Sequence, residues 1–186
     1  MKKPEGYNEA AAYSGTGGSR QLPTGGYICR IKNAKEETNS GYWQLALAFD
    51  IAEGPEEGFY NDAFKARQQY GSDAKWPAVY RQMVEGKDGK ANPFFKGMIT
   101  AIEESNPGFA FNFDEKTLIG KLFGGVFGQE EFTDQNGVLR TTTKLQQIRS
   151  VNAIRQGDFK VPDIKREKAS AAATTAAPVN IGECPF

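Results

Sequence analysis

Positively charged side chains recur at alternate positions along segments of this 186-residue chain that are expected to be extended. Between Val138 and Leu145, Arg140 and Lys144 share one face, because successive side chains of a strand point to opposite faces. Cations spaced in this way can neutralise the phosphates of a nucleic-acid backbone. We therefore expect an anion-binding surface, with single-stranded nucleic acid as its ligand. The cations expected on strands or at strand ends are Arg30, Lys32, Lys65, Arg67, Arg140, Lys144 and Arg149.

Two tyrosines supply the second feature that single-strand binding needs, a flat ring on which a base can stack. Such stacking contributes about 1–3 kcal/mol per base whatever the sequence. Tyr42 and Tyr60 lie opposite the apolar faces of their expected strands, so they are the predicted stacking rings. The alternative is that they cover a minor core. The aromatic residues expected in the main core are Trp43, Trp76, Phe94 and Phe95.

Catalytic residues are sparse. The chain contains no histidine, which removes Ser/His and Cys/His triads, histidine zinc sites and the commonest general base. Adjacent glutamates recur, but Glu130 and Glu131 would point to opposite faces of a strand and would not hold one ion together. We expect a protein that is not an enzyme and needs no cofactor or metal. The alternatives are a divalent-metal-dependent nuclease, or another small DNA-processing enzyme, and a structural β-protein that exposes a basic ribbon.

Composition restricts the class of protein further. The 23 basic and 23 acidic residues balance, which argues against a protein that coats duplex DNA but permits a local basic stripe. Mean hydropathy is −0.57, and no apolar run approaches the roughly 20 residues that span a bilayer. No signal-peptide core follows Met1. We therefore expect a cytoplasmic location, with Cys29 and Cys184 as free thiols.

The pattern of alternation predicts a mainly β fold with inserted helices. The longest element is a hairpin over residues 121–151, whose turn contains Asn136 and Gly137, a pair that favours tight turns. A bulge near Gln146 would restore the alternation of its second arm. The other expected strands are 27–34, 42–51 and 59–65, and the expected helices are 74–85 and 93–105. The order β-β-β-α-β-β is typical of a five-stranded OB-type barrel, which binds oligonucleotides on one face.

Three parts of the chain are predicted from composition. Residues 1–21 are rich in Gly, Ala and Ser and are expected to form a flexible N-terminal arm. Residues 22–168 form the expected OB-type single-stranded-DNA-binding domain. Residues 169–186 combine an Ala/Thr-rich flexible linker with a C-terminal interaction tip, so both ends of the chain are predicted to be disordered.

Several motifs occur together in an order that resembles a known family. They are Leu-Pro-x-Gly-Gly-Tyr at 22–27, Phe-Asp-Ile-Ala-Glu-Gly at 49–54, Phe-Phe-Lys at 94–96, Ile-Glu-Glu-Ser-Asn at 102–106, Gly-Lys at 120–121, Gly-Gln-Glu-Glu-Phe at 128–132 and Arg-Gln-Gly-Asp-Phe-Lys-Val-Pro at 155–162. The chain resembles a phage-borne family of OB-fold single-stranded-DNA-binding proteins. The resemblance implies a protein that coats and protects single-stranded DNA during phage DNA replication and recombination, in the cytoplasm of a bacterial host.

The end of the chain resembles the C-terminal tip of bacterial single-stranded-DNA-binding proteins. A terminal Phe can fill an apolar pocket while its carboxylate meets a cation. The resemblance makes Glu183, Pro185 and Phe186 the expected partner-binding residues, which would recruit replication or recombination proteins. Only Glu183 supplies a side-chain negative charge, and Cys184 replaces the usual aliphatic residue. An ordinary disordered end is the alternative. A homo-oligomer is also possible from the sequence.

Overall fold

The computed structural model describes residues 20–39, 41–69 and 73–167. The expected N-terminal arm, except Arg20 and Gln21, and the tip residues Glu183, Pro185 and Phe186 lie outside this part. The elements in chain order are β1 (Gly25–Asn39), β2 (Tyr42–Ile51), α1 (Phe59–Gln68), β3 (Val79–Met83), α2 (Pro93–Ser105), the 3-10 helix η1 (Glu115–Leu118), β4 (Leu122–Thr133), β5 (Leu139–Arg149) and α3 (Val151–Gln156). No helix in the described ranges has the length and apolar character required to cross a bilayer.

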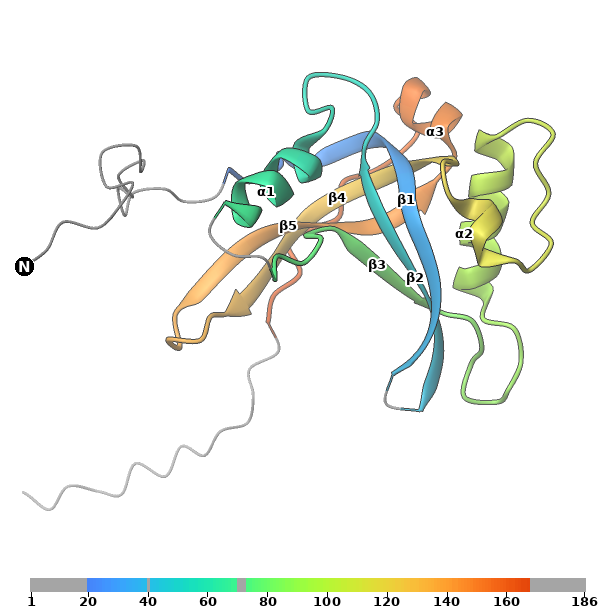
Figure 1. Ribbon diagram of the computed structural model, residues 1–186, viewed down its shortest axis with the longest axis horizontal. Coiled ribbons are helices and arrows are strands. Elements are labelled where there is room, and N and C mark those ends of the chain that lie inside the picture. Colours follow the sequence, from blue (N-terminus) through green and yellow to red (C-terminus); the bar gives the residue numbers. More distant parts are fainter. Residues whose placement is uncertain (1–19, 40, 70–72, 168–186) are drawn as a thin grey trace, which may run out of the picture.

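The five strands form one antiparallel sheet in the order β3-β2-β1-β4-β5. Three strands follow one another in space, and the fourth returns beside the first, which is the Greek-key order. The sheet is strongly bent, and its two long hairpins project from the body of the molecule (Figure 1). The predicted mainly β class with inserted helices is confirmed. The sheet is open, since β3 and β5 do not pair, so the expected closed barrel is not what the structure shows.

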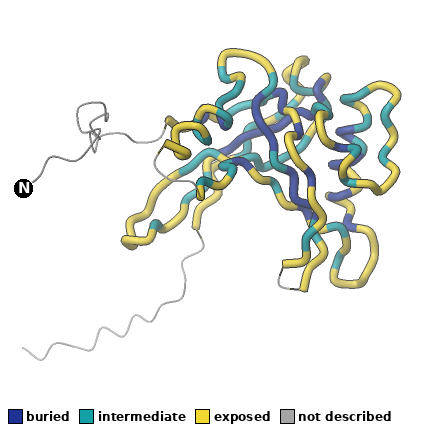
Figure 2. The backbone as a smooth tube through the Cα atoms, viewed as in Figure 1, coloured by how far each residue is buried: buried dark blue, intermediate teal, exposed yellow. Residues whose placement is uncertain are grey.

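The core lies against one face of this sheet, called here the inner face. Along β2, Leu47 and Phe49 point inward and are buried, as the alternation predicts. Phe123 and Phe127 of β4 are fully buried, and each has an edge-to-face contact with the Phe49 ring. The buried stretches of the backbone follow β1, β2 and β4 through the middle of the molecule (Figure 2). The opposite side is called the outer face.

Helix α2 packs on this core and has the predicted bounds. Asn92 caps its first turn by accepting a hydrogen bond from Phe94 N, and Pro93 occupies the first helical position. At the other end, the Asn106 side chain accepts from Leu122 N at 3.0 Å and donates to Leu122 O at 2.8 Å. The helix is thereby fixed to the start of β4.

The prediction for residues 59–65 is wrong, because this segment is helix α1 rather than a strand. Gly58 precedes it with a φ of 75°, a conformation that suits glycine. The Asp50 carboxylate then accepts a hydrogen bond from Tyr60 N at 3.0 Å. This contact joins residues ten positions apart, so local alternation does not reveal it.

The prediction of a helix over residues 74–85 is also wrong, because the segment contains strand β3. Tyr80 and Val84 pack against the core, whereas Val79 and Met83 are exposed. Trp76 anchors the approach to β3 by donating from Nε1 to Phe49 O at 2.9 Å. Without the 3-10 helix, the observed order is therefore β-β-α-β-α-β-β-α.

Strand β1 is longer than expected. Its pairing with β2 continues to the pair Asn39 and Tyr42, beyond residue 34, where the predicted strand ends. Lys32 lies at the register shift between Ile31 and Asn33. The extra residues make β1 and β2 a projecting hairpin (Figure 1).

The predicted hairpin of β4 and β5 is confirmed, and so is its bulge. Phe127 pairs with Leu145 and Val126 pairs with Gln147, which leaves Gln146 as the extra residue. The turn is wider than an Asn-Gly two-residue turn, because Asp134 N donates to Val138 O and only Gly137 has a positive φ.

The chain after α3, residues 157–167, is called here the strap. Its Phe159 ring lies over Gly26, where an added Cβ would come within 2.5 Å of it. Further on, Lys165 forms a parallel bridge with Glu130 at the edge of β4.

Helix α3, which the sequence does not predict, packs on the outer face, with Ile154 against Gly124.

Candidate nucleic-acid interface

The outer face of β1, β2 and β3 has a floor of small residues between two cations. Ala46 of β2 pairs with Lys35 of β1 on one side and with Arg81 of β3 on the other. Ala48, the next outward residue of β2, continues the floor. The two cations are exposed while Ala46 is buried. This outer-face row of Lys35, Ala46, Ala48 and Arg81, together with Tyr42, Gln44 and Met83 nearer the tip of the hairpin, is called here the trough.

Apolar side chains extend this face toward the tip of the β1–β2 hairpin. Tyr42 is 43% exposed and Met83 is 40% exposed, although both are large hydrophobic residues. Between them lies Gln44, whose Oε1 is buried without a hydrogen-bond partner in the described residues. Buried acceptors are rarely left unpaired, so such an atom indicates a missing donor.

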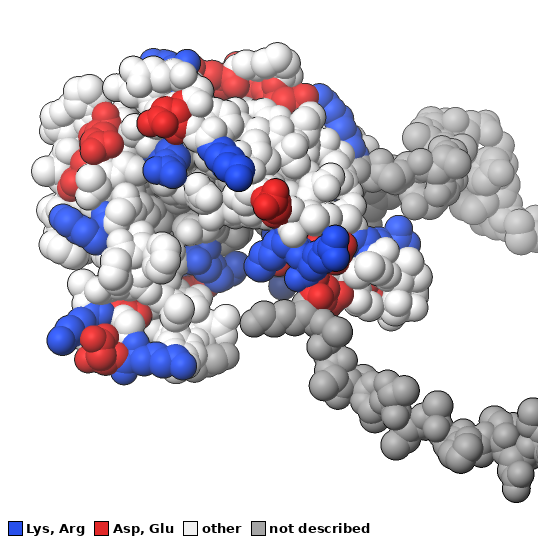
Figure 3. Space-filling view, turned by 180° about the vertical axis from the view of Figure 1, so that it is seen from behind, with Lys and Arg blue, Asp and Glu red and all other residues white. Residues whose placement is uncertain are grey.

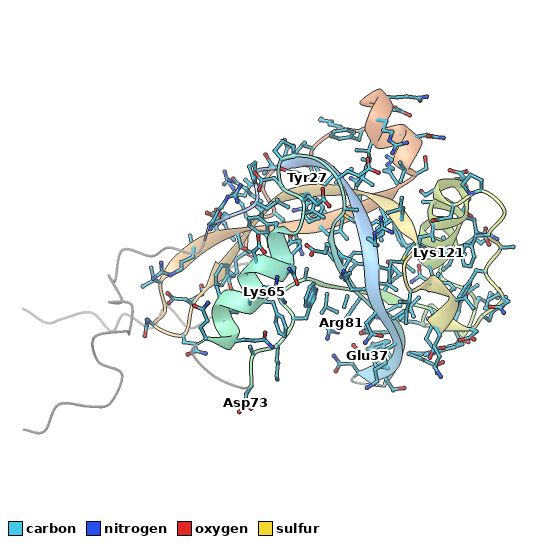
Figure 4. All side chains as sticks on the ribbon, turned by 45° about the horizontal axis from the view of Figure 1, so that its top comes forward. Tyr27, Glu37, Lys65, Asp73, Arg81 and Lys121 are labelled. Carbon is cyan, nitrogen blue, oxygen red and sulfur yellow. The ribbon has the colours of Figure 1, made fainter. Side chains whose placement is uncertain are left out.

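Arg81 is held in place by a neighbour on the same face. Its Nε donates to Glu37 Oε1 at 2.5 Å, and its side chain stays 48% exposed. Lys65, Arg81 and Glu37 follow one another from α1 to the β1–β2 hairpin (Figure 4). The guanidinium is thus positioned by one carboxylate and open to a ligand on its other edge.

The β4–β5 hairpin carries a second group of cations. Arg140 and Lys144 lie on the outer face of β5, as predicted, and both are exposed. Arg140 pairs with Asp134 at 2.5 Å, and Lys144 shares Glu130 with Lys165 of the strap. These carboxylates offset part of the positive charge.

The pKa of Glu130 reflects this sharing. Partial burial acts to raise it, but the hydrogen bond from Lys165 and the charge of Lys144 outweigh that effect and lower the pKa. Glu130 is therefore ionised at neutral pH and holds the strap to the hairpin.

Seen from behind the view of Figure 1, the surface has a hollow between the two projecting hairpins, with Lys and Arg on its walls (Figure 3).

The other five predicted cations lie outside these two groups. Arg30 pairs with Leu122 and Arg149 with Gly124, so the two flank the start of β4 on the outer face. Lys65 and Arg67 lie on α1 rather than on a strand. Together with Lys32, these residues are exposed and make no ion pair within the described ranges. The predicted set is therefore distributed over several surfaces.

Tyr60 must be removed from the predicted set. Its side chain is only 9% exposed, and its ring packs edge-on against Phe49 and Phe59. Burial, with smaller contributions from Cys29 and Asp50, raises its pKa. A ring in this position has no free face for a base. Tyr42, by contrast, is exposed on the outer face as expected.

Four residues of the trough with a proposed ligand contact, Lys35, Gln44, Arg81 and Met83, are absent from the sequence-based prediction. The sequence does not predict Arg81 and Met83 as site residues, because apolar residues at helical spacing around them indicate a helix. The same segment also has the period of two that indicates a strand, since Val79, Arg81 and Met83 alternate with inward residues. Lys35 lies just beyond the expected end of its strand.

A metal centre is not evident in the part of the chain that the structure describes. No group of three or more Asp, Glu or Cys residues there is placed to hold an ion. Glu130 faces outward to its two lysines, whereas Glu131 accepts from Glu167 N.

The sequence matches no protein-family model, and a search of curated proteins finds no match. The function proposed below therefore depends on the geometry of the outer face and on the sequence motifs.

Proposed function

We propose that this protein binds single-stranded DNA without sequence specificity and belongs with the phage-borne OB-fold single-stranded-DNA-binding proteins. One observation carries the proposal. The outer face of β1, β2 and β3 combines a floor of small residues, flanking cations and exposed apolar side chains. Cations for phosphates and apolar surfaces for bases are the two features that single-strand binding requires.

The strand order supports this placement. An OB fold is a partly open Greek-key barrel that binds oligonucleotides on its second and third strands, between the β1–β2 and β4–β5 loops. The sheet order β3-β2-β1-β4-β5 has the same Greek-key neighbours, and both hairpins project beside the trough. We propose that β3 and β5 form the open side of such a barrel.

The chemistry of the trough suits a flexible strand. Lys35 and Arg81 would contact phosphates on the two sides of the alanine floor. Tyr42 would stack on one base, and Met83 would contact the next. Gln44 Oε1 would accept from an amino group of a base, which would give this buried oxygen a partner. A duplex hides its base faces, so it should bind less well.

In this proposal the protein coats and protects single-stranded DNA during phage DNA replication or recombination, in the cytoplasm of a bacterial host. It needs no cofactor for this role. The terminal residues Glu183, Pro185 and Phe186 would recruit replication or recombination proteins, with the carboxylates and the Phe ring as contacts.

Fluorescence anisotropy tests the proposal. The full chain is titrated into labelled oligothymidine of about 20 nucleotides, longer than the roughly 4–16 that one OB fold covers, and into its duplex. We expect binding to the single strand alone, weakening steeply with salt. Combined replacement Lys35→Gln and Arg81→Gln should reduce affinity, whereas Lys96→Gln on α2 should not. Equal binding of duplex would overturn the proposal, and degradation of the strand with Mg²⁺ or Mn²⁺ would favour a nuclease.

A further inference from the structure

A pocket with aromatic walls lies on the inner face of the β1–β2 hairpin, behind the candidate interface. Its volume is about 360 Å³. Trp43 of β2 and Phe95 of α2 form one part of the wall, and Phe111 and Phe113 of the segment before η1 form another. Trp43 is 40% exposed and Phe113 is 82% exposed, so large apolar surfaces face solvent at this site. Aromatic rings that line a concave site and stay exposed form a surface that a ligand or partner can cover.

The backbone at Phe113 is strained. Its φ is 64°, and it is the one residue other than glycine with a positive φ among those described. A bulky side chain rarely adopts this conformation, and such outliers cluster at ligand sites. The segment is held by Glu103, which accepts from Phe111 N at 2.9 Å, and the Phe111 and Phe113 ring centroids lie 5.4 Å apart. The strained backbone thus places the Phe113 ring in solvent at the edge of the Trp43 pocket.

Three carboxylates surround the aromatic walls. Glu36 comes from β1, Glu85 follows β3, and Glu115 begins η1. None of the three makes an ion pair with another described residue. Unpaired carboxylates beside aromatic faces favour a cation, through direct attraction and through the negative faces of the rings. They repel a phosphate backbone, so this pocket is a poor site for DNA.

We propose that this pocket is a docking site for a protein partner, which inserts a bulky apolar side chain flanked by lysine or arginine. The ring or aliphatic group of the partner fills the space between Trp43 and Phe113. Its flanking cations meet the three glutamates. The charge of the rim selects this occupant over nucleic acid and over an acidic peptide.

The proposal stands apart from DNA binding. Adjacent side chains of β2 point to opposite faces, so Tyr42 belongs to the trough and Trp43 to the pocket. The two ligands would therefore approach the same hairpin from opposite sides. A protein partner could be bound while DNA occupies the outer face.

Fluorine NMR of the full chain tests the proposal directly. Incorporation of 5-fluorotryptophan gives two resonances, one for each Trp, and Trp43→Phe assigns them. The probes are the capped tripeptides Lys-Phe-Lys, Glu-Phe-Glu and Lys-Ala-Lys. We expect Lys-Phe-Lys to shift the Trp43 resonance saturably and to leave Trp76 unmoved. Glu-Phe-Glu should bind about tenfold more weakly or not at all, and Lys-Ala-Lys should cause no shift.

Variants separate the pocket from the general surface. Phe113→Asn removes the ring but tolerates the positive φ, and it should abolish the shift, as should combined Glu36→Gln, Glu85→Gln and Glu115→Gln. Phe94→Ala is the matched control, because Phe94 is a similarly exposed ring outside this pocket, and it should leave binding unchanged. Thermal melts verify that each variant is folded. Equal shifts from all three peptides, no shift from any, or a Trp43 shift caused by oligothymidine alone would overturn the proposal.

Discussion

The Nε atom of Arg81 on β3 donates to Glu37 Oε1 on β1 over 2.5 Å, across the intervening strand β2. If the guanidinium also contacts a phosphate, the carboxylate competes for it. Glu37→Gln should therefore tighten binding of oligothymidine. Arg81→Gln should weaken it and reduce the slope of log K against log salt by about 0.7, the value for one contact on a single strand. Anisotropy titrations at several salt concentrations measure both, and an unchanged slope in Arg81→Gln would remove it from the interface.

The two predicted stacking tyrosines should respond in opposite ways to replacement. Tyr42→Ala should weaken single-strand binding by about 1–3 kcal/mol at every base composition, with little change in stability, because the ring is exposed. Tyr60→Ala should instead destabilise the fold by about 3–5 kcal/mol, because it empties a space beside Phe49. Denaturant melts and binding titrations of both variants separate these effects. Loss of binding in a fully stable Tyr60→Ala protein would restore that ring to the interface.

Attachment of the strap should depend on pH through Glu130. Its folded-state pKa lies below the ordinary 4.5, so its ionised form stabilises the fold at neutral pH. This contribution is lost as the pH falls below about 4.5 and through the lowered value. The protection factors of the Lys165 and Glu131 amides against hydrogen exchange, corrected for the slower intrinsic exchange at low pH, should therefore fall in acid, because both amides form backbone hydrogen bonds at this junction. Glu130→Gln should show faster exchange already at neutral pH and a weaker acid dependence.

Two glycines outside the positive-φ region should respond with opposite sign to alanine. At Gly124 an added Cβ would lie 2.4 Å from Ile154 Cγ1 and 2.6 Å from Ser150 O, so Gly124→Ala should cost about 1–3 kcal/mol. At Gly97 of α2 nothing lies within 4 Å, and Gly97→Ala should stabilise by about 0.5–1 kcal/mol. Chemical denaturation gives both values. A neutral Gly124→Ala would mean that α3 does not pack closely on β4.

Elements with a strong local pattern could be predicted from the sequence. The alternation of β2, the apolar stripe of α2 and the broken alternation at Gln146 all led to correct elements. The segments at 59–65 and 74–85 could not be assigned in this way, because their structures depend on distant partners. The Asp50 carboxylate holds Tyr60 N, and β3 exists through its pairing with β2. Local periodicity contains neither contact.

The candidate site was harder to predict than the fold. Arg140 and Lys144 do share one face of β5, as side-chain alternation predicts, whereas Lys32 of β1 lies at a register shift that alternation does not reveal. One side of the trough is formed by β3, which the sequence does not predict. Arg81 and Met83 on that strand were therefore not expected at the site. The pocket around Trp43 was missed for a different reason. Trp43 continues the apolar face of β2, and only the projection of the hairpin beyond the core leaves it exposed.

The bridge at Lys165 has a consequence for how the molecule behaves in a crowded solution. Lys165 N donates to Gln129 O and Lys165 O accepts from Glu131 N, each at 2.9 Å, along the part of β4 that extends past the start of β1. Without the strap, this stretch would present unpaired backbone groups, which are a template for pairing between molecules. A chain cut after residue 160 would expose that template on every copy. We therefore expect the strap to protect this edge of β4 from self-association, so that the solubility of the protein should depend on residues outside the proposed DNA-binding trough.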